Sequence, residues 1–548
     1  MPFAIDSKIL VATTCAGLAS DRRSAESRLQ RNDESEHLIR NEDALSTADV
    51  EDLRAAAESL DAGKVVRTLD AMLLARAGNF SRPVPNFNAF YATLLSYLKH
   101  ELQDGWIYVE HDDGMVYPEL VTSVVHSAVT RDRDTPTVTV HTTYYGRTQS
   151  NRIGVCKNSH RFDPQDVARR RIADTLRNAG IQKESSALRA DYDSALKRHH
   201  EVTADAFAKQ FRLNGVAAGI EGDNRARLEN RKFENRKVIF DLDKGSFGAL
   251  QGFVDSELFD GHAEHPDVGS IPEHPIVKVF DLKTHDFVWA NSAFLTPYQY
   301  DKSLRDKLIL PASHRDLLDV LTTNLDAFIN DIIEGKSAGN VVLNKGIPGV
   351  GKTLTAEVYA ELIEKPLYSI HSGSLGTTAR DIQKNLQILF DRAERWGCVM
   401  LLDEADVFVV KRGDNIEQNA IVAEFLRTLE YFNGLLFMTT NRPHDIDDAI
   451  ISRCAAIIDY APPDAKDAAA IWRVMDGQFK AGLSGDLITE LVKLFPAIAP
   501  RDIKMLLRLA LRVALGRGEA LTLDTFRRCA MFRAIKMSEQ HGKEIGHE

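Results

Sequence analysis

The sequence predicts an α/β module, in which helices flank a parallel sheet, followed by a helical region and preceded by an α+β domain with a helical insertion. From about residue 336 onward, short apolar runs alternate with helical patterns, an order that is typical of parallel sheets. Residues from about 465 to 540 are rich in helical patterns. Upstream, strand patterns are interrupted by a long, charged, helix-prone stretch, which indicates a mixed domain.

The length of the chain predicts several domains. A domain typically takes about 100–200 residues, so 548 residues correspond to about three or four domains. From the shifts in composition we expect a flexible or helical N-terminal segment at 1–88, an α+β N-terminal domain at 89–300 with its helical insertion near 163–212, an α/β subdomain at 301–464, and a helical subdomain and tail at 465–548.

The composition excludes several classes of protein. Hydrophobic residues make up 44% of the chain and charged residues 27%, which is ordinary for a globular protein and excludes a wholly disordered or collagen-like chain. The net charge of −11 argues against a nucleic-acid binder, which usually has a strongly basic domain. Five scattered cysteines without a CxxC pair favour a reducing, intracellular and cytoplasmic location. No apolar run reaches the roughly 18 residues of a membrane span, and Asp6 before the apolar residues 9–19 argues against a cleaved signal.

The N-terminal segment has no aromatic residue between Phe3 and Phe80. Residues 20–45 consist mostly of charged and small polar side chains, and we expect them to be disordered or loosely attached because they bury little apolar surface. From Thr47 onward apolar residues recur at helical spacing, and the stretch 81–88 with its prolines is expected to be a linker.

Residues 89–160 change from a helical to a strand pattern. Phe90 and Leu94 recur at the spacing of a helix. Apolar and β-branched runs then predict strands, with a hairpin turn at 111–114 between the first two. The expected strands are 106–109, 115–117, 121–129 and 137–145, and strand patterns return at 238–240, 276–280 and 287–289.

The helical insertion at 163–212 is broken near Gly180 and carries two apolar stripes. Leu188, Tyr192 and Leu196 form the first stripe, and Phe207 and Phe211 form the second. His199 and His200 follow two basic residues, which favours a solvent-facing pair over a metal site.

Two further stretches are more typical of structure than of a binding site. The basic run 225–237 is interleaved with Glu229 and Glu234, which favours a solvated helix face over a nucleic-acid patch. The stretch 241–245 resembles the start of a calcium-binding loop. Gly252 stands where such a loop needs a bidentate glutamate, so we expect a turn between strands.

A glycine-rich loop follows the short apolar run 341–343 and precedes a helical stretch. Its pattern, G-x-x-x-x-G-K-T, lets successive backbone N–H groups turn inward and bind phosphate oxygens, and the following helix N-terminus adds its positive dipole end. Lys352 would reach the β- and γ-phosphates of ATP, and the Thr353 hydroxyl would ligate Mg²⁺. The candidate nucleotide-binding residues are Gly346, Ile347, Pro348, Gly349, Val350, Gly351, Lys352, Thr353 and Leu354.

Acidic and amide side chains follow two further apolar runs. Asp403 and Glu404 follow the run 399–402, and the carboxyl end of a parallel strand points into the crevice where phosphates bind. Asp403 would therefore hold Mg²⁺, and Glu404 would act as general base on the attacking water. Asn441 ends the run 435–440, where a neutral amide can orient that water.

These motifs resemble the AAA branch of the AAA+ ATPases over roughly residues 296–540. The resemblance is carried by GIPGVGKT (346–353), LLDEAD (401–406), TTNR (439–442) and IDDAIISR (446–453). The surrounding sequence is similar to an AAA subgroup frequent in fungi, whose members carry a large N-terminal domain. The resemblance implies a P-loop AAA+ module with 301–464 as its large nucleotide-binding subdomain and 465–548 as a helical lid.

The resemblance also implies roles for individual residues. Lys352 and Thr353 match the Walker A positions, Asp403 and Glu404 match Walker B, and Asn441 matches sensor 1. Arg453 matches an arginine finger that acts on the neighbouring subunit's site, so a homo-oligomeric, hexameric ring is implied. Arg501 matches a sensor 2 arginine. The alternative interpretation of Arg453 is a surface arginine that caps a helix end, and that of Arg501 is a surface charge at a helix N-terminus; both are less favoured than the family roles.

The sequence departs from the family pattern at three places. Ile450 occupies the slot where many members carry a further arginine, and many members lack an arginine at the position of Arg501. The stretch 375–380, which corresponds to the pore loop, contains no aromatic residue to grip an extended polypeptide.

The motifs do not determine which process ATP hydrolysis drives, and three interpretations remain. A ring ATPase that remodels a protein client bound through its N-terminal domain is favoured by the acidic charge and the large appended domain. A nucleic-acid loader or remodeller is the alternative, because the lid carries Arg508, Arg512, Arg517, Arg527, Arg528 and Arg533. A nucleotide-gated scaffold is disfavoured by the presence of Glu404.

Overall fold

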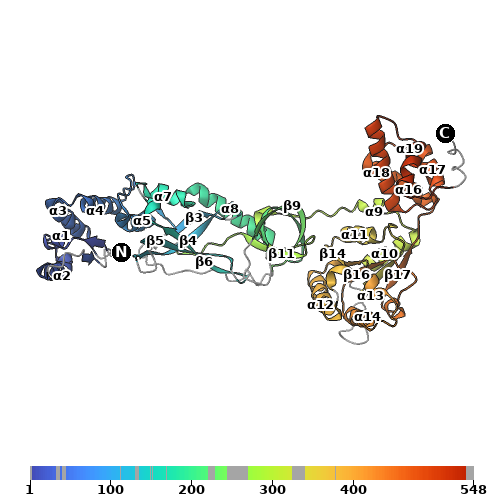
Figure 1. The fold of residues 1–548 in the computed structure, drawn as a ribbon, viewed down its shortest axis with the longest axis horizontal. Coiled ribbons are helices and arrows are strands. Elements are labelled where there is room, and N and C mark those ends of the chain that lie inside the picture. Colours follow the sequence, from blue (N-terminus) through green and yellow to red (C-terminus); the bar gives the residue numbers. More distant parts are fainter. Residues whose placement is uncertain are drawn as a thin grey trace.

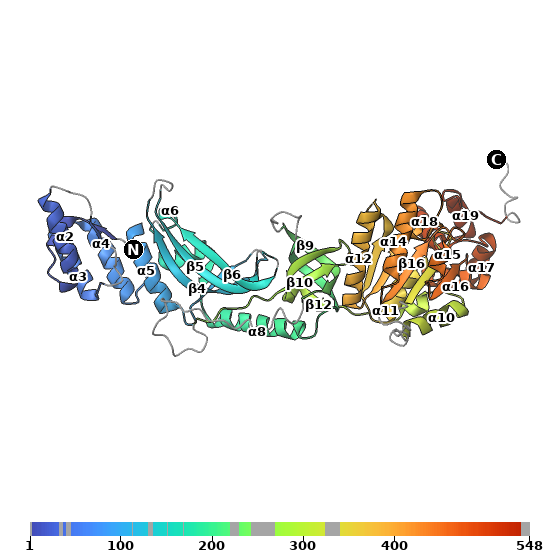
Figure 2. The same ribbon diagram turned by 90° about the horizontal axis from the view of Figure 1, so that it is seen from below.

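The computed structural model describes residues 3–31, 37–39, 45–111, 113–129, 135–148, 150, 152–167, 169–219, 229–242, 269–323, 340–376 and 378–538. In two perpendicular views the parts of the chain follow one another along the long axis, from N-terminal helices at one end to the C-terminal α/β and helical parts at the other (Figure 1, Figure 2).

The N-terminal part is mostly helical, which corrects the expectation of disorder for residues 20–30. Helix α2 covers Ala19–Gln30, and its Ala25 packs in one apolar core with Leu10 and with Leu53 of a later helix. Burial of these small and aliphatic side chains orders the segment without aromatic residues. Residues 32–36 and 40–44 lie outside the described part. The elements here are β1 (Phe3–Ile5), α1 (Ser7–Val11), β2 (His37–Ile39), α3 (Thr47–Ser59), α4 (Gly63–Arg76) and α5 (Phe87–Glu101).

An antiparallel sheet with strand order β6-β5-β4-β3-β7 follows, and α5 packs on it through an apolar core around Phe90 and Phe162. The predicted hairpin is confirmed, because the His111 N–H donates to the Met115 carbonyl at 2.9 Å and the two strands pair. The runs predicted at 115–117 and 121–129 form one strand with an irregularity between Val121 and Ser123. The strands are β3 (Trp106–Glu110), β4 (Val116–Ser127), β5 (Thr137–Arg147), β6 (Ile153–Phe162) and β7 (Ile181–Lys183).

The predicted insertion contains α6 (Pro164–Val167), α7 (Ile172–Asn178) and α8 (Ser186–Thr203). The break near Gly180 leads into β7, which adds an edge strand to the sheet. The second predicted stripe is wrong, because Phe211 lies in strand β8 rather than on a helix.

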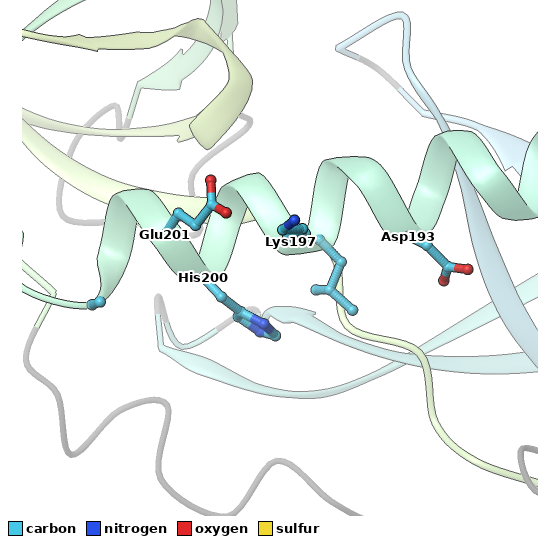
Figure 3. A pocket seen from close by; sticks show the side chains of 6 residues that line it. Asp193, Lys197, His200 and Glu201 are labelled. Carbon is cyan, nitrogen blue, oxygen red and sulfur yellow. The ribbon is translucent and has the colours of Figure 1, made fainter.

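The histidine pair on α8 is also corrected in part. His199 is buried, because it lies one heptad after buried Tyr192 on the same helix face, and its Nδ1 lies 3.1 Å from the Ser292 hydroxyl. His200 is exposed and lies 3.1 Å from Glu273. Figure 3 shows His200 and Glu201 projecting to different sides of α8 instead of converging. Among the described residues, no group of three or more histidine, cysteine or acidic side chains is placed to hold a metal ion.

A small closed sheet follows α8. Its strand order is β11-β10-β9-β8-β12, and β11 also pairs with β8, which closes the sheet into a barrel. The prediction of a helix for the basic run is therefore wrong over 229–237. These residues belong to β9, where apolar Phe233 faces the barrel core. Residues 225–228 and 243–250 lie outside the described part. The strands are β8 (Gln210–Gly219), β9 (Glu229–Phe240), β10 (Ile276–Asp281), β11 (Asp286–Asn291) and β12 (Leu295–Pro297).

The predicted parallel sheet with flanking helices is confirmed in the C-terminal part. The strand order is β14-β15-β16-β13-β17, and every pairing is parallel. Of these strands, β14 and β17 were not predicted. The strands are β13 (Asn340–Gly346), β14 (Leu367–His371), β15 (Val399–Asp403), β16 (Leu435–Thr440) and β17 (Ala456–Tyr460); the helices are α9 (Leu304–Lys307), α10 (Ala312–Thr323), α11 (Lys352–Leu362), α12 (Ala379–Trp396), α13 (Asp406–Val409), α14 (Ile416–Leu429) and α15 (Asp448–Ile451).

The last described part is helical, as predicted. Its apolar core surrounds Trp472, which is fully buried. The helices are α16 (Ala465–Phe479), α17 (Gly485–Leu494), α18 (Pro500–Arg517) and α19 (Leu523–Met531). None of the helices in the described ranges is both long and apolar enough to cross a membrane.

The barrel packs directly on the parallel-sheet module. The Phe280 ring lies 4.8 Å from the Trp396 ring, centroid to centroid. The Asp241 carboxylate is buried and accepts a hydrogen bond from the Trp396 indole at 2.8 Å. Lys237 of β9 donates to Glu361 of α11 at 2.9 Å. Contacts between aromatic rings and paired charges therefore fix the two units to each other.

Candidate nucleotide-binding site

The glycine-rich loop connects the end of β13 to the start of α11, as the motif requires. Gly346 has φ 147°, and a Cβ there would lie 2.2 Å from the Tyr460 carbonyl oxygen. Gly349 has φ 86°, and its Cβ would lie 2.9 Å from Arg501 Cβ. Only glycine fits both positions, so the loop follows closely along β17 and α18. In the loop Val350 is buried, whereas Ile347 and Leu354 are exposed.

Lys352 is the buried cation of this loop. Its side-chain Nζ donates to the carbonyl oxygens of Gly346 and Ile347 at 2.7 and 2.8 Å, and to Asn441 Oδ1 at 2.9 Å. Burial lowers the pKa of Lys352 and Arg501 acts in the same direction, whereas the carboxylate of Asp403 raises it. An ammonium held at a ring of carbonyl oxygens and oriented toward the loop is suited to bind phosphate oxygens.

Thr353 and Asp403 lie together at the carboxyl end of the sheet. The Thr353 hydroxyl donates to Asp403 Oδ1 at 2.8 Å, and the Thr439 hydroxyl donates to the same oxygen at 2.6 Å. A hydroxyl and a carboxylate oxygen at this spacing form the hard-oxygen set that Mg²⁺ prefers, together with phosphate oxygens and waters. These residues therefore fit a magnesium ion bound with a nucleotide.

Glu404 follows Asp403 in a left-handed backbone conformation, with φ 55°. Its N–H lies 2.9 Å from the Thr439 hydroxyl, and its carbonyl accepts a hydrogen bond from Ser372 at 2.7 Å. Non-glycine residues rarely adopt this conformation, so the surroundings hold the turn in place. The side chain is exposed, which leaves the carboxylate in contact with water.

Asn441 lies at the end of the neighbouring strand β16. Its backbone N–H donates to Asp406 Oδ1 at 3.0 Å, and the Thr440 hydroxyl donates to the same carboxylate at 2.5 Å. Sequence reasoning missed Asp406 and Thr439 as the groups that orient this site. Their signal was present, because both lie inside the two motifs that supplied Asp403 and Asn441.

Arg501 comes to the loop from the helical part. It lies in the first turn of α18, and its backbone N–H donates to the Gly349 carbonyl at 3.1 Å. The contact with Gly349 and the effect on the Lys352 pKa place Arg501 beside the candidate phosphate site.

Arg453 makes its contacts elsewhere. It follows α15, donates to the Ala449 carbonyl at 3.1 Å, and lies 3.9 Å from the Glu430 carboxylate. Its side chain is 36% exposed. Within one chain Arg453 is therefore a surface arginine at a helix end, and the structure does not bring it together with Lys352 and Asp403.

Comparisons with known proteins agree with this geometry. Residues 342–461 match the family described as "ATPase family associated with various cellular activities (AAA)". This range contains the glycine-rich loop, both carboxylates, Asn441 and Arg453. The match begins at residue 342, so it does not extend to the helices, sheet and barrel of the N-terminal parts.

Similar proteins include several named AAA ATPases. An "Uncharacterized AAA family ATPase y4kL" of Sinorhizobium fredii is 32% identical over 145 residues, which are 25% of this chain and 42% of that protein. The "ATPase family AAA domain-containing protein FIGL1" of Arabidopsis thaliana is 30% identical over 212 residues, 35% of this chain and 31% of that protein. The similarity thus spans less than half the length of each relative.

One solved structure is similar over part of the chain. It belongs to the HORMA:CdnC:Trip13 complex of E. coli MS115-1, with a TM-score of 0.35 and 19% identity. The likeness covers 43% of this chain and 92% of that one.

Proposed function

From the AAA ATPase domain at residues 342–461, we propose that this chain is a ring-forming ATPase that couples ATP hydrolysis to the remodelling of a protein client bound through its N-terminal domain. The observation that supports it most is the convergence of Lys352, Thr353, Asp403 and Asn441 within hydrogen-bond distance at one edge of a parallel sheet. Such an edge is where phosphate ligands bind in α/β folds.

Each side chain of the site has a separate role in ATP hydrolysis. Lys352 binds the β- and γ-phosphate oxygens in place of its present carbonyl partners, and Thr353 and Asp403 hold Mg²⁺. The ion supplies charge neutralisation on the phosphates. Glu404 accepts a proton from the attacking water, and Asn441 orients that water. Arg501 adds positive charge from the lid of the same chain.

The position of Arg453 supports assembly into a homo-oligomeric, hexameric ring. It lies exposed at a helix end, outside its own chain's cluster, where a neighbouring subunit's site can receive it. A contact of one surface with a different surface on the next copy closes into a ring when the rotation allows. The inserted guanidinium neutralises transition-state charge, which can be worth about 10³–10⁵ in rate.

The client is bound through the N-terminal parts rather than gripped at the pore stretch. In the stretch 375–380, Leu375 is buried, and no aromatic residue is available to hold an extended polypeptide. The antiparallel sheet and the barrel supply the surfaces for such a client, and the barrel is fixed on the α/β module through Asp241 and Lys237.

A nucleic-acid-linked ATPase is the second candidate. Arg508 and Arg512 lie exposed one turn apart on α18, which favours it. Two other lid arginines are already paired, Arg528 with Asp524 and Arg533 with Asp502, which weakens the case.

The test is the ATPase rate of the full chain with and without an unfolded polypeptide, and with and without DNA or RNA at low salt. The proposal expects stimulation by polypeptide alone. Stimulation by nucleic acid that falls steeply with added salt would support the second candidate instead, since phosphate contacts release counterions. No ATP turnover at all would overturn both candidates.

A further inference from the structure

A cavity of about 170 Å³ lies between the antiparallel sheet and the barrel, far along the chain from the nucleotide site. Its walls come from β4, β5, β8 and β11 and from the segment just before β10. A cavity of about 150 Å³ is enough to hold benzene, so this one has room for a molecule of about that size. The His111 side chain at its edge is 20% exposed, which indicates access from solvent.

The cavity contains buried polar atoms that the described residues leave unsatisfied. Trp289 lines it at 3% exposure, and its indole Nε1–H has no hydrogen-bond partner among the described residues. His274 lines it at 2% exposure, and within the same ranges its Nδ1 also has none. Buried polar groups without partners cost stability, and together they indicate a ligand that completes them.

The hydrogen-bonding character of His274 follows from its other nitrogen. Nε2 lies 3.0 Å from the Pro118 carbonyl, which only accepts, so Nε2 carries the proton. Burial lowers the pKa of His274 to about 3, which keeps the ring neutral. Nδ1 is therefore an acceptor, and it requires an N–H or O–H donor on the ligand.

The cavity also has a cationic and an anionic end. The Arg147 guanidinium lies 5.7 Å from the centroid of the Trp289 ring. Two residues along β11 on the same strand face, the Asn291 amide donates to Asp113 Oδ2 at 3.3 Å. An α-amino acid carries an anionic and a cationic group separated by a single carbon, so it matches a cavity that is lined by both an arginine and a carboxylate.

We propose that this cavity binds a free α-amino acid as a zwitterion. The carboxylate of the ligand faces Arg147 and the Trp289 indole N–H, and its ammonium faces Asp113 and His274 Nδ1. The ring of Tyr144, which stacks on His274 with centroids 4.0 Å apart, forms a flat wall for the ligand's carbon atoms. The site lies outside the matched AAA range, so it adds a small-molecule function to the N-terminal parts.

The first test needs no mutation. The full chain is titrated by calorimetry with each of the twenty proteinogenic amino acids, and saturable one-to-one binding is expected for at least one. The N-acetyl and the carboxamide derivatives of that amino acid should each bind at least about tenfold more weakly, because each lacks one charge. Absence of saturable binding by all twenty, or equal binding of both derivatives, would overturn the proposal.

A matched pair of variants locates the site. Trp289→Phe keeps an aromatic ring but removes the indole N–H, and it should weaken binding about tenfold. Trp472→Phe is the control, because Trp472 in α16 is also buried with an unpartnered indole nitrogen among the described residues. Equal affinity of the two variants would contradict the assignment, once circular dichroism shows that both are folded.

Discussion

At the scale of single residues, the candidate site depends on one buried ammonium and two carboxylates. The motifs allowed Lys352, Thr353, Asp403 and Asn441 to be predicted to lie together, because each follows a parallel strand. Their orientation could not be predicted: Thr439 bonds to both Asp403 and the Glu404 backbone, and this depends on the register of β15 on β16.

Lys352→Ala is expected to abolish nucleotide binding. The variant removes the ammonium that lies against the loop carbonyls, and charge-assisted bonds to phosphate are among the stronger polar contacts. The affinity for a fluorescent ATP analogue should fall at least about tenfold. Lys302→Ala removes an exposed lysine paired with Glu364 and serves as control. Equal affinity of wild type and Lys352→Ala would refute the assigned role.

Glu404→Gln is expected to keep ATP binding and lose turnover. The amide retains the size of the side chain but cannot accept the proton from water, and a general base typically contributes about 10²–10⁴ in rate. Steady-state hydrolysis and analogue binding are measured on the same preparation, with the exposed Glu417→Gln as control. A variant that turns over at the wild-type rate would remove Glu404 from the mechanism.

At the scale of elements, the antiparallel sheet contains a buried carboxylate that joins three strands. Glu119 of β4 accepts hydrogen bonds from Thr142 of β5 and from Asn158 of β6, and it lies 3.0 Å from His160 Nε2. Burial alone raises the pKa of Glu119, but hydrogen bonds from His111, His160 and Thr142 hold this pKa well below the ordinary value.

Glu119→Gln is expected to lower the free energy of unfolding at neutral pH and to make that free energy less dependent on pH. Because the folded pKa is depressed, the stabilisation is present above the ordinary value of 4.5 and is lost as pH falls below it. At pH 7 the variant should lose about 1.5–3 kcal/mol, the usual scale for hydrogen bonds to a charged group. Thermal unfolding of both proteins at pH 7 and pH 4 checks this. Parallel pH profiles would contradict it.

Some elements could not be predicted from local pattern. The run 229–237 is charged or polar at every position except Phe233, and its interleaved acidic and basic residues were interpreted as a solvated helix face, yet pairing with β8 makes it a strand. Strands β14 and β17 were missed because buried residues alternate with less buried ones in both, whereas β15 of the same length has a continuous apolar run. Tertiary pairing overrides local propensity in such cases.

At the scale of the whole molecule, the contact between barrel and α/β module was beyond prediction. Lys237 and Glu361 are 124 positions apart in the chain, and Trp396 bonds to Asp241 at a separation of 155. Sequence patterns report local periodicity, and such distant pairs have none. Through this contact the barrel is joined to α11, the helix that begins at Lys352.

Mixing two inactive variants tests whether Arg453 acts between subunits. Arg453→Ala and Glu404→Gln should each be nearly inactive, but a mixed ring contains sites with an intact Glu404 and a neighbour's intact Arg453. An equal mixture should recover about a quarter of the wild-type rate, because a complete site needs one subunit of each kind in order. Mixed rings are verified by co-purification of differently tagged subunits. No recovery in verified mixed rings would assign Arg453 a role within its own chain.

The ring proposal is tested most directly by measuring specific ATPase activity against protein concentration, with the oligomer fraction determined by sedimentation in the same samples. We predict that activity per subunit rises with concentration and follows the fraction assembled, and that Arg453→Ala stays low even when fully assembled. Full activity in a sample that sediments as monomer would contradict a site completed by its neighbour.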